Sequence, residues 1–296
     1  MLFRSKEMKT KEAGADTAAA AAAKTPFFMS KPQPTTPVQL VLDEKYQTAK
    51  PVNYRKNEEL RMSGSSMYSI RALKEIAKPA KKLKAPLYVF DLRQESHGYV
   101  NDKPATWQAD HDWANSDLNH DEAIQRERRQ LSELAIGSTV DGITVNSTES
   151  EESVVRSQGH EYVRLTVTDH LRPTDTEVDR FLSAVRGLPE KSWVHFQCRA
   201  GKGRTTTFMV MYDMLHNASN ASFDEIIKRN AELSDDYDVM AVVPNDNWKY
   251  VYQKERADFV REFYNYAKAN PDAKGQLWTE WVRKRSEEHT SELQSH

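Results

Sequence analysis

The stretch from residue 192 to 215 reads SWVHFQCRAGKGRTTTFMVMYDML and holds the only cysteine of the 296-residue chain, Cys198. An apolar, strand-like run leads to this cysteine, a glycine-rich turn follows, and an apolar helical pattern begins near Arg204. Gly201 and Gly203 let the turn curl so that its N–H groups point inward, and the following helix adds the positive end of its dipole. The pattern predicts a strand, a phosphate-binding loop and a helix.

The residues of this loop are those of a cysteine-dependent phosphatase. The thiolate of Cys198 would attack phosphorus, while the planar guanidinium of Arg204 grips two phosphate oxygens and Thr205 hydrogen-bonds the sulfur. The alternative is that a lone cysteine after an apolar strand is a small buried hydrophobe, but its fixed spacing from glycine, arginine and threonine favours catalysis. The other loop residues are predicted to bind substrate phosphate: Arg199, Ala200, Gly201, Lys202 and Gly203.

A phosphocysteine mechanism also needs an acid that protonates the leaving oxygen. The segment RLTVTDHLRPT, residues 164–174, offers Asp169 directly after a predicted strand. Aspartates at strand ends are often turn formers, so position alone leaves both roles open for this carboxylate.

Composition limits the classes of protein to consider. The formal charge of -2 argues against a nucleic-acid-binding surface along the whole chain, and no apolar run approaches the length of about 20 residues that spans a bilayer. No group of Cys and His has zinc-ligand spacing, so we expect no metal and no cofactor. The expected partner is a small-molecule substrate, and the sequence does not predict an oligomeric state.

Strand and helix patterns alternate along the chain, which predicts an α/β fold with a central, partly parallel sheet flanked by helices. Strands are expected at 38–42, 86–92, 162–167 and 192–196, and helices at 67–84, 116–136, 174–186, 203–216 and within 223–285. Ser63, Ser65 or Ser66 would cap the first helix and Pro79 would end it. The proline-containing extended segment before residue 56 and the polar stretch 137–160 are expected to form a small β subdomain.

Three segments follow from these patterns. Residues 1–36 include a six-alanine run among charges and are expected to be disordered or a leader. Residues 37–285 are expected to form one phosphatase domain, including the small β subdomain. Residues 286–296, SEEHTSELQSH, resemble the translation of a sequencing adapter and are expected to be an artefact.

Nine short stretches match, in order, a known family. They are NYR at 53–55, SGSS at 63–66, DLRQESHGY at 91–99, DWAN at 112–115, TDH at 168–170, DRFL at 179–182, HFQCRAGKGRTTTFMVM at 195–211, WK at 248–249 and FYNY at 263–266. On these residues the chain resembles the bacterial protein-tyrosine-phosphatase-like inositol polyphosphate phosphatases, the cysteine phytases. The resemblance implies that fold, and it implies that Asp169 is the general acid. It also implies that substrate is bound by His170, Arg55, Asp112, Lys249 and, with a poorer local match, Arg256.

The chain departs from the family at two places in the loop. The residue before the nucleophile, usually His, is Gln197, which can hydrogen-bond the local backbone but adds no charge. Arg199 and Lys202 flank Gly201, a pairing similar to the loop CKAGKGRT of a phosphoinositide phosphatase. Two added cations favour a substrate with several phosphates, unless both side chains point to solvent. Elsewhere, Asp91 and Arg93 are expected to form an ion pair that braces the loops.

The resulting prediction is hydrolysis of phosphomonoesters of myo-inositol hexakisphosphate and lower inositol polyphosphates through a phosphocysteine. The enzymatic alternatives are a protein-tyrosine phosphatase or a phosphoinositide phosphatase, in either case as a secreted effector. A catalytically silent phosphate-binding module is the alternative from another class. The resemblance favours a secreted, periplasmic or host-delivered protein over a strictly cytoplasmic one.

Overall fold

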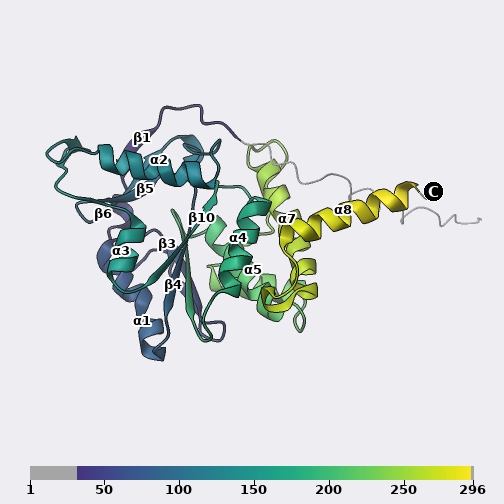
Figure 1. Cartoon of the computed structure of the whole chain (residues 1–296). Helices are drawn as coiled ribbons and strands as arrows, with labels where there is room; N and C mark the ends of the chain where they lie inside the picture. Colours follow the sequence, from purple (N-terminus) through teal and green to yellow (C-terminus); the bar gives the residue numbers. More distant parts are fainter. Residues whose placement is uncertain (1–31, 295–296) are drawn as a thin grey trace, which may run out of the picture. The chain divides into compact units, whose positions relative to one another are not determined.

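The computed structural model describes residues 32–294, with side chains up to residue 287. Its centre is a five-stranded sheet in the spatial order β10, β4, β11, β3, β2 (Figure 1). In that order the strands are Glu161–Val167, Leu87–Arg93, Trp193–Cys198, Met62–Ser66 and Arg55–Asn57. The first four strands are parallel to their neighbours and only β2 is antiparallel, which confirms the expected partly parallel sheet.

Strand β11 lies in the middle of the sheet and is buried along its whole length. Its neighbours β4 and β3 both run parallel to it. In the register of the sheet, Phe196 pairs with Phe90 of β4 on one side and with Gly64 of β3 on the other. Parallel sheets covered on both faces are built from such continuously buried strands. Cys198 ends β11 and therefore lies at the carboxyl edge of the sheet, where α/β proteins place their ligands.

Strand β3, MSGSS, contradicts the expectation that its serines cap a helix. The hydroxyls of Ser63 and Ser65 hydrogen-bond the two ring nitrogens of His195 in β11, at 2.9 and 3.1 Å. A Cβ at Gly64 would lie 2.5 Å from Sδ of Met209, a residue of the helix Gly203–Asn217 (α5). Glycine at this position therefore lets α5 pack closely against β3. Tertiary contacts thus override a poor strand propensity here.

Helices cover both faces of the sheet, with α1 and α3 on one side and α4, α5 and α7 on the other (Figure 1). They are α1 Leu73–Leu83, α2 His120–Glu133, α3 Glu151–Ser157, α4 Asp175–Arg186, α5 Gly203–Asn217, α6 Phe223–Leu233, α7 Tyr250–Ala269 and α8 Trp278–Gln294. Short 3-10 helices occur at Glu44–Tyr46, Ile70–Ala72, Asp110–Asp112 and Pro271–Ala273. None of the helices between residues 32 and 294 has the length and apolar character that crossing a bilayer requires.

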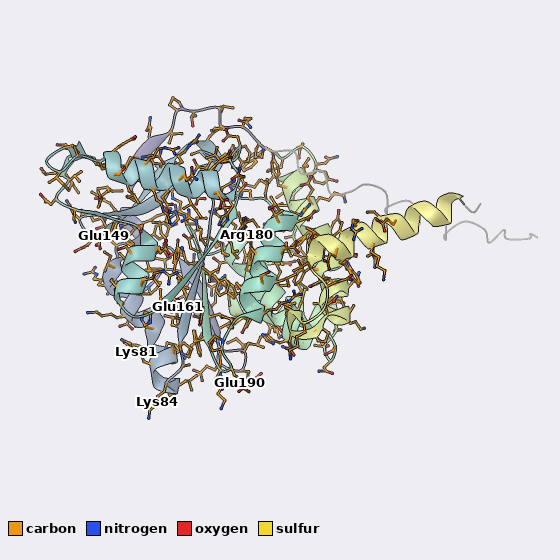
Figure 2. The ribbon with its side chains drawn as sticks, in the orientation of Figure 1. Lys81, Lys84, Glu149, Glu161, Arg180 and Glu190 are labelled. Carbon is orange, nitrogen blue, oxygen red and sulfur yellow. The ribbon has the colours of Figure 1, made fainter. Side chains whose placement is uncertain are left out.

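The helices are amphipathic where they meet solvent. Lys81 and Lys84, at the end of α1, lie at the outer edge of the protein (Figure 2), and Arg180 of α4 is exposed. Helix α1 continues through Pro79 to Leu83, so the expectation that this proline ends the helix is wrong. The buried face of α1, packed against β4 and β11, outweighs the loss of one backbone hydrogen bond at the proline.

A second, antiparallel sheet forms the small β subdomain, with the order β1, β6, β5, β9. Its strands are Gln39–Leu42, Lys103–Gln108, His97–Val100 and Thr148–Glu149, and a separate hairpin joins β7 Thr139–Val140 to β8 Ile143–Thr144. The first and last strands come from the segments expected to form this subdomain. Strands β5 and β6, and helix α3 with its cap Ser150, were not expected.

The segment boundaries stay predictions. Residues 1–31 lie outside the described residues, so the expectation of a disordered or leader segment falls almost entirely there. Helix α8 continues past Ser286 to Gln294, through most of the stretch expected to be an artefact.

Candidate active site

The loop between β11 and α5 surrounds the sulfur of Cys198 with donors. The Gly201 N–H lies 3.3 Å from Sγ and the Thr205 hydroxyl lies 3.1 Å from it. Cys198 is buried, with 2% of its surface exposed. Donors converging on a sulfur at the N-terminus of a helix stabilise the thiolate form, which is the nucleophile.

Gly201 adopts a left-handed conformation, with φ +73°. A Cβ at this position would lie 2.2 Å from the Ser66 nitrogen and 2.4 Å from the Ser65 carbonyl carbon. The turn therefore needs glycine both for its conformation and for the close approach of β3. At Gly203 a Cβ would lie 3.3 Å from the Tyr237 hydroxyl, so this position also faces a neighbouring loop.

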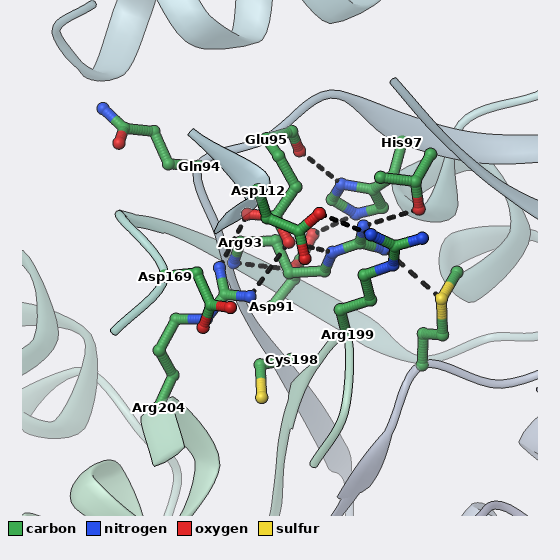
Figure 3. A network of polar contacts seen from close by, with 12 residues as sticks. Asp91, Arg93, Gln94, Glu95, His97, Asp112, Asp169, Cys198, Arg199 and Arg204 are labelled. Atoms are coloured by element: carbon green, nitrogen blue, oxygen red, sulfur yellow. Dashed lines mark hydrogen bonds and ion pairs between the residues drawn. The ribbon is translucent and has the colours of Figure 1, made fainter. Parts of the chain in front are cut away.

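Arg204 is fixed by a buried carboxylate (Figure 3). Its terminal nitrogens donate to the two oxygens of Glu95 at 2.6 and 2.9 Å, and one also donates to the Val167 carbonyl at 3.0 Å. Nε lies 3.1 Å from Asp169 Oδ1 but makes no hydrogen bond of good geometry within residues 32–294. Of five guanidinium donors, two remain for a phosphate.

Burial disfavours charge on both partners of this pair, but their mutual attraction outweighs it. The pKa of Glu95 is held well below its usual range because Arg204 and Arg93 outweigh the cost of burial. The pKa of Arg204 is raised well above its usual value, since Asp169 and Glu95 likewise outweigh burial. Glu95 belongs to the DLRQESHGY stretch but was given no role in the sequence analysis, because its partner lies 109 residues away.

The expected ion pair between Asp91 and Arg93 is wrong. Arg93 Nε donates to Glu95 at 2.8 Å, whereas Asp91 pairs with His97 at 2.8 Å and with Arg164 at 3.0 Å. The stretch still braces the site, because Arg93 fixes the carboxylate that fixes Arg204.

Arg199 is neither a free cation nor a solvent-facing side chain. It donates to Asp43 Oδ1 at 2.8 and 3.1 Å and to Gln108 at 2.7 Å, and it forms a very short ion pair with Asp112. Burial opposes its charge, but Asp112 and Asp43 raise its pKa above the usual value. Asp43, which nothing in the sequence marks as a partner, turns Arg199 into a support of the loop. Lys202, in contrast, is exposed.

Asp112 stands in an unusual electrostatic environment. Its pKa is raised to about 6, chiefly by burial and then by the nearby carboxylate of Glu95, against the opposing effect of Arg199. Its carboxylate therefore changes charge close to neutral pH.

Asp169 lies two residues after the end of β10 and faces Arg204 of the loop, with 25% of its side chain exposed. The indole N–H of Trp113 donates to the Asp169 backbone carbonyl at 3.1 Å. His170 Nε2 lies 3.4 Å from Asp169 Oδ2, and burial lowers the pKa of this histidine despite the carboxylate. The structure thus brings together the predicted acid, the predicted clamp and the predicted phosphate ligand His170.

The other predicted substrate-binding residues fall into two groups. Arg55 is 8% exposed and donates to the Gly201 carbonyl at 2.5 Å and to Thr206 at 2.8 Å, so it supports the loop backbone from behind. Burial lowers its pKa to about 10. Arg256 is similarly buried and donates to the Val239 carbonyl at 3.1 Å. Lys249 and Ala200 retain exposed surface.

The side-chain amide of Gln197, which is able to hydrogen-bond the local backbone, donates to both oxygens of Glu151 at 3.0 and 3.1 Å. Glu151, Asp91 and His97 form a buried cluster whose ligand atoms lie within 4.8 Å of one another, which is compatible with a metal ion. Positive charge is already supplied there: Arg164 lies 3.0 Å from Asp91, and the pKa of His97 is raised to about 9 because Asp91 and Glu127 outweigh burial and the repulsion of Arg93. The cluster is thus a charge-matched network beneath the loop.

Comparison with known proteins yields one consistent family. A family model described as PTP-like phytase, inositol hexakisphosphate, matches residues 127–216. The PTP-like phytase from Bdellovibrio bacteriovorus is 65% identical, with a TM-score of 0.85, over 87% of this chain and 99% of that one. The PTP-like myo-inositol phosphatase from Mitsuokella multacida, solved with myo-inositol-(1,3,4,5)-tetrakisphosphate, is 29% identical, with a TM-score of 0.76, over 85% of this chain and 50% of that one.

A curated relative is the effector protein hopD2 of Pseudomonas syringae pv. tomato, 34% identical over 217 residues. The match covers 67% of this chain and 46% of hopD2, so the chain spans about half the length of that relative.

Proposed function

The chain belongs to the protein-tyrosine-phosphatase-like phytases, which are cysteine-dependent phosphatases, and we propose that it hydrolyses phosphomonoesters of myo-inositol hexakisphosphate and lower inositol polyphosphates. The observation that carries the proposal is the meeting of three groups at the end of β11. Cys198 Sγ accepts two hydrogen bonds, two N–H donors of Arg204 make no hydrogen bond to the described residues, and one of these donors, Nε, faces Asp169 Oδ1 at 3.1 Å. A nucleophile, a clamp and an acid therefore surround one phosphate site.

In the first step the Cys198 thiolate attacks phosphorus, so an S–P bond forms while the P–O bond to the inositol ring breaks. Asp169 donates its proton to the leaving oxygen, which departs as an alcohol. The free donors of Arg204 and the inward N–H groups of the loop stabilise the charge on the transferred phosphoryl oxygens. Glu95 keeps the guanidinium oriented throughout.

In the second step a water molecule attacks the phosphocysteine. Asp169, now a carboxylate, accepts the proton of the water, and the S–P bond breaks to release inorganic phosphate. The departing thiolate is stabilised by the Thr205 hydroxyl, which lies 3.1 Å from the sulfur. The site then returns to its starting protonation state.

The charges around the loop support a substrate with several phosphates. Arg55 and Arg256 are buried next to the loop and donate to neutral groups. Lys202 adds an exposed positive charge, and Lys249 adds a partly buried one. The charge of Arg199, which the sequence analysis counted toward the substrate, is matched by two carboxylates. The polyphosphate preference therefore rests on the other cations, with His170 beside the acid.

The test is phosphate release from inositol hexakisphosphate by wild type and by Cys198→Ser. We expect turnover by wild type and none by the variant, with both proteins equally folded by circular dichroism. Because Cys198 is the only cysteine, alkylation by iodoacetate should inactivate wild type at one site, and bound phosphate should protect it. Phosphate release by the serine variant near the wild-type rate would refute the mechanism.

The rival substrates are separated in the same assay. A phosphotyrosine peptide and a phosphoinositide in vesicles are compared with inositol hexakisphosphate by kcat/KM. We expect the inositol polyphosphate to be preferred, because a phosphotyrosine presents one phosphate to a site with several cations. A higher kcat/KM for the peptide or the lipid would replace the proposed substrate.

We also propose that the protein acts outside the cytoplasm of the producing cell, by secretion or by delivery into a host. The similarity to an effector protein supports this localisation. Fractionation of the producing bacterium tests it, and recovery of the protein in the cytoplasm alone would contradict it.

A further inference from the structure

Five aromatic side chains, with Trp248 at their centre, meet beside Asp169. The ring of Trp248 lies 3.9 Å from that of His111, 5.0 Å from His170 and 5.7 Å from Trp113, measured between centroids. Tyr252, one turn further along, completes the group at 6.4 Å. These rings come from three separate segments. His111 and Trp113 belong to the 3-10 helix Asp110–Asp112 and the residue after it, and His170 belongs to the loop after β10. Trp248 lies just before α7, and Tyr252 lies at its start.

The two histidines in contact with Trp248 are each next to an acid of the site. His111 precedes Asp112, and His170 follows Asp169. His111, Asp112 and His170 all have positive φ, at 55°, 59° and 68°. Such left-handed residues are strained and persist only where their surroundings hold them. Packing against the Trp248 ring supplies that support from outside.

Trp248 itself is not a core residue, because 42% of its surface is exposed. A large indole at a partly exposed position is better explained by its local contacts than by the stability of the whole fold. Its edge-to-face contact with His170, at 86° between ring planes, fixes the residue next to the general acid. The Trp113 indole fixes the same loop through the Asp169 carbonyl.

We propose that Trp248 is a positioning residue for the general acid, holding the Asp169–His170 loop against the site through its ring contacts with His170 and His111. The inference rests on the proposed phosphatase function. It adds to that function a residue outside the Asp169–His170 loop that holds this loop in place. Proton donation is needed most when the leaving oxygen is a poor leaving group, as an inositol alkoxide is. Loss of Trp248 should therefore slow these substrates and spare those with good leaving groups.

The experiment compares wild type, Trp248→Ala, Trp248→Phe and Asp169→Asn on inositol hexakisphosphate and on a series of aryl phosphates with different leaving-group pKa values. We expect kcat of Trp248→Ala on inositol hexakisphosphate to fall about 10- to 100-fold, within the range that general acids contribute. Its rates on the aryl series should depend more steeply on leaving-group pKa, as those of Asp169→Asn should. Trp248→Phe, which keeps a ring, should stay close to wild type.

The matched control is Val251→Ala, because Val251 lies three positions after Trp248 and is 51% exposed in the first turn of α7. Its slope should equal that of wild type. An unchanged slope in Trp248→Ala, with only KM raised, would show that Trp248 binds substrate and would overturn the proposal. Failure of Trp248→Ala to fold would make the residue structural, which also overturns it. If wild type hydrolyses no phosphomonoester, the proposed function itself fails.

Discussion

Replacing Asp112 by Asn tests the electrostatics of the site through stability. The pKa of Asp112 is raised from 3.8 to about 6, first by burial and then by Glu95, with Arg199 opposing. An acid whose pKa is higher in the folded state binds more protons there, so the free energy of unfolding falls as pH rises from about 4 to about 6 and stays lower above that range. At about 1.4 kcal/mol per pH unit, this gap is worth at most about 3 kcal/mol.

We therefore expect Asp112→Asn to be more stable than wild type at pH 8, with Tm higher by up to about 6–12 °C, and to show little difference at pH 4. Thermal unfolding from pH 4 to pH 8.5 measures both values. Asp110→Asn is a matched control of opposite sign, because hydrogen bonds from Thr35 and Thr36 lower the pKa of Asp110 to about 2. That variant should be less stable than wild type at neutral pH.

A kinetic measurement gives a second view of the same group. As pH rises through about 6, Asp112 gains the charge that faces Arg199, so KM for inositol hexakisphosphate should rise in wild type more than in Asp112→Asn. Titration of the substrate affects both proteins equally and cancels in the comparison. The reasoning is refuted if Asp112→Asn is destabilised at pH 8, or if its Tm difference from wild type does not change with pH.

Two further substitutions test the supports of the loop. Gly201→Ala should abolish turnover and lower Tm, because the added Cβ would lie 2.2 Å from the Ser66 nitrogen. Activity of this variant within about twofold of wild type would contradict the close approach of β3. Glu95→Gln removes the fully buried carboxylate that Arg204 shares with Arg93 and leaves Asp169 as the remaining charge partner of Arg204, so we expect a loss of stability of about 3–5 kcal/mol and a fall in kcat. Unchanged thermal unfolding and kinetics would show that Arg204 is held by its other contacts.

The sequence predicts the parts of the site that are local. Cys198, Arg204 and Thr205 lie within eight residues of one another, and the strand, turn and helix around them follow from apolar pattern and glycine alone. The β3 strand could not be predicted in this way, because MSGSS has neither an apolar alternation nor β-branched residues. It is a strand because Gly64 makes room for α5 and because its serines satisfy a buried histidine.

Contacts between distant segments also decide the direction of each charged side chain. Arg199 was counted as a cation for the substrate because Asp43, 156 positions earlier, carries no signal that it would pair with it. Glu95, similarly, stands in a recognisable stretch, but nothing in its neighbourhood names Arg204 as its partner. Charge counts from sequence therefore overestimate the free positive charge of such a loop.

These contacts join the two ends of the phosphate loop through the small β subdomain. Arg204, at the start of α5, binds Glu95, which binds Arg93. Arg93 donates to Thr106 of β6 at 2.8 Å, and Thr106 in turn donates to Asp43, which holds Arg199 at the beginning of the loop. Because every link is buried or nearly so, removing one leaves an unpaired charge or polar group next to the site. The small subdomain thus helps to set the geometry of the catalytic loop, although it contributes neither the nucleophile nor the acid.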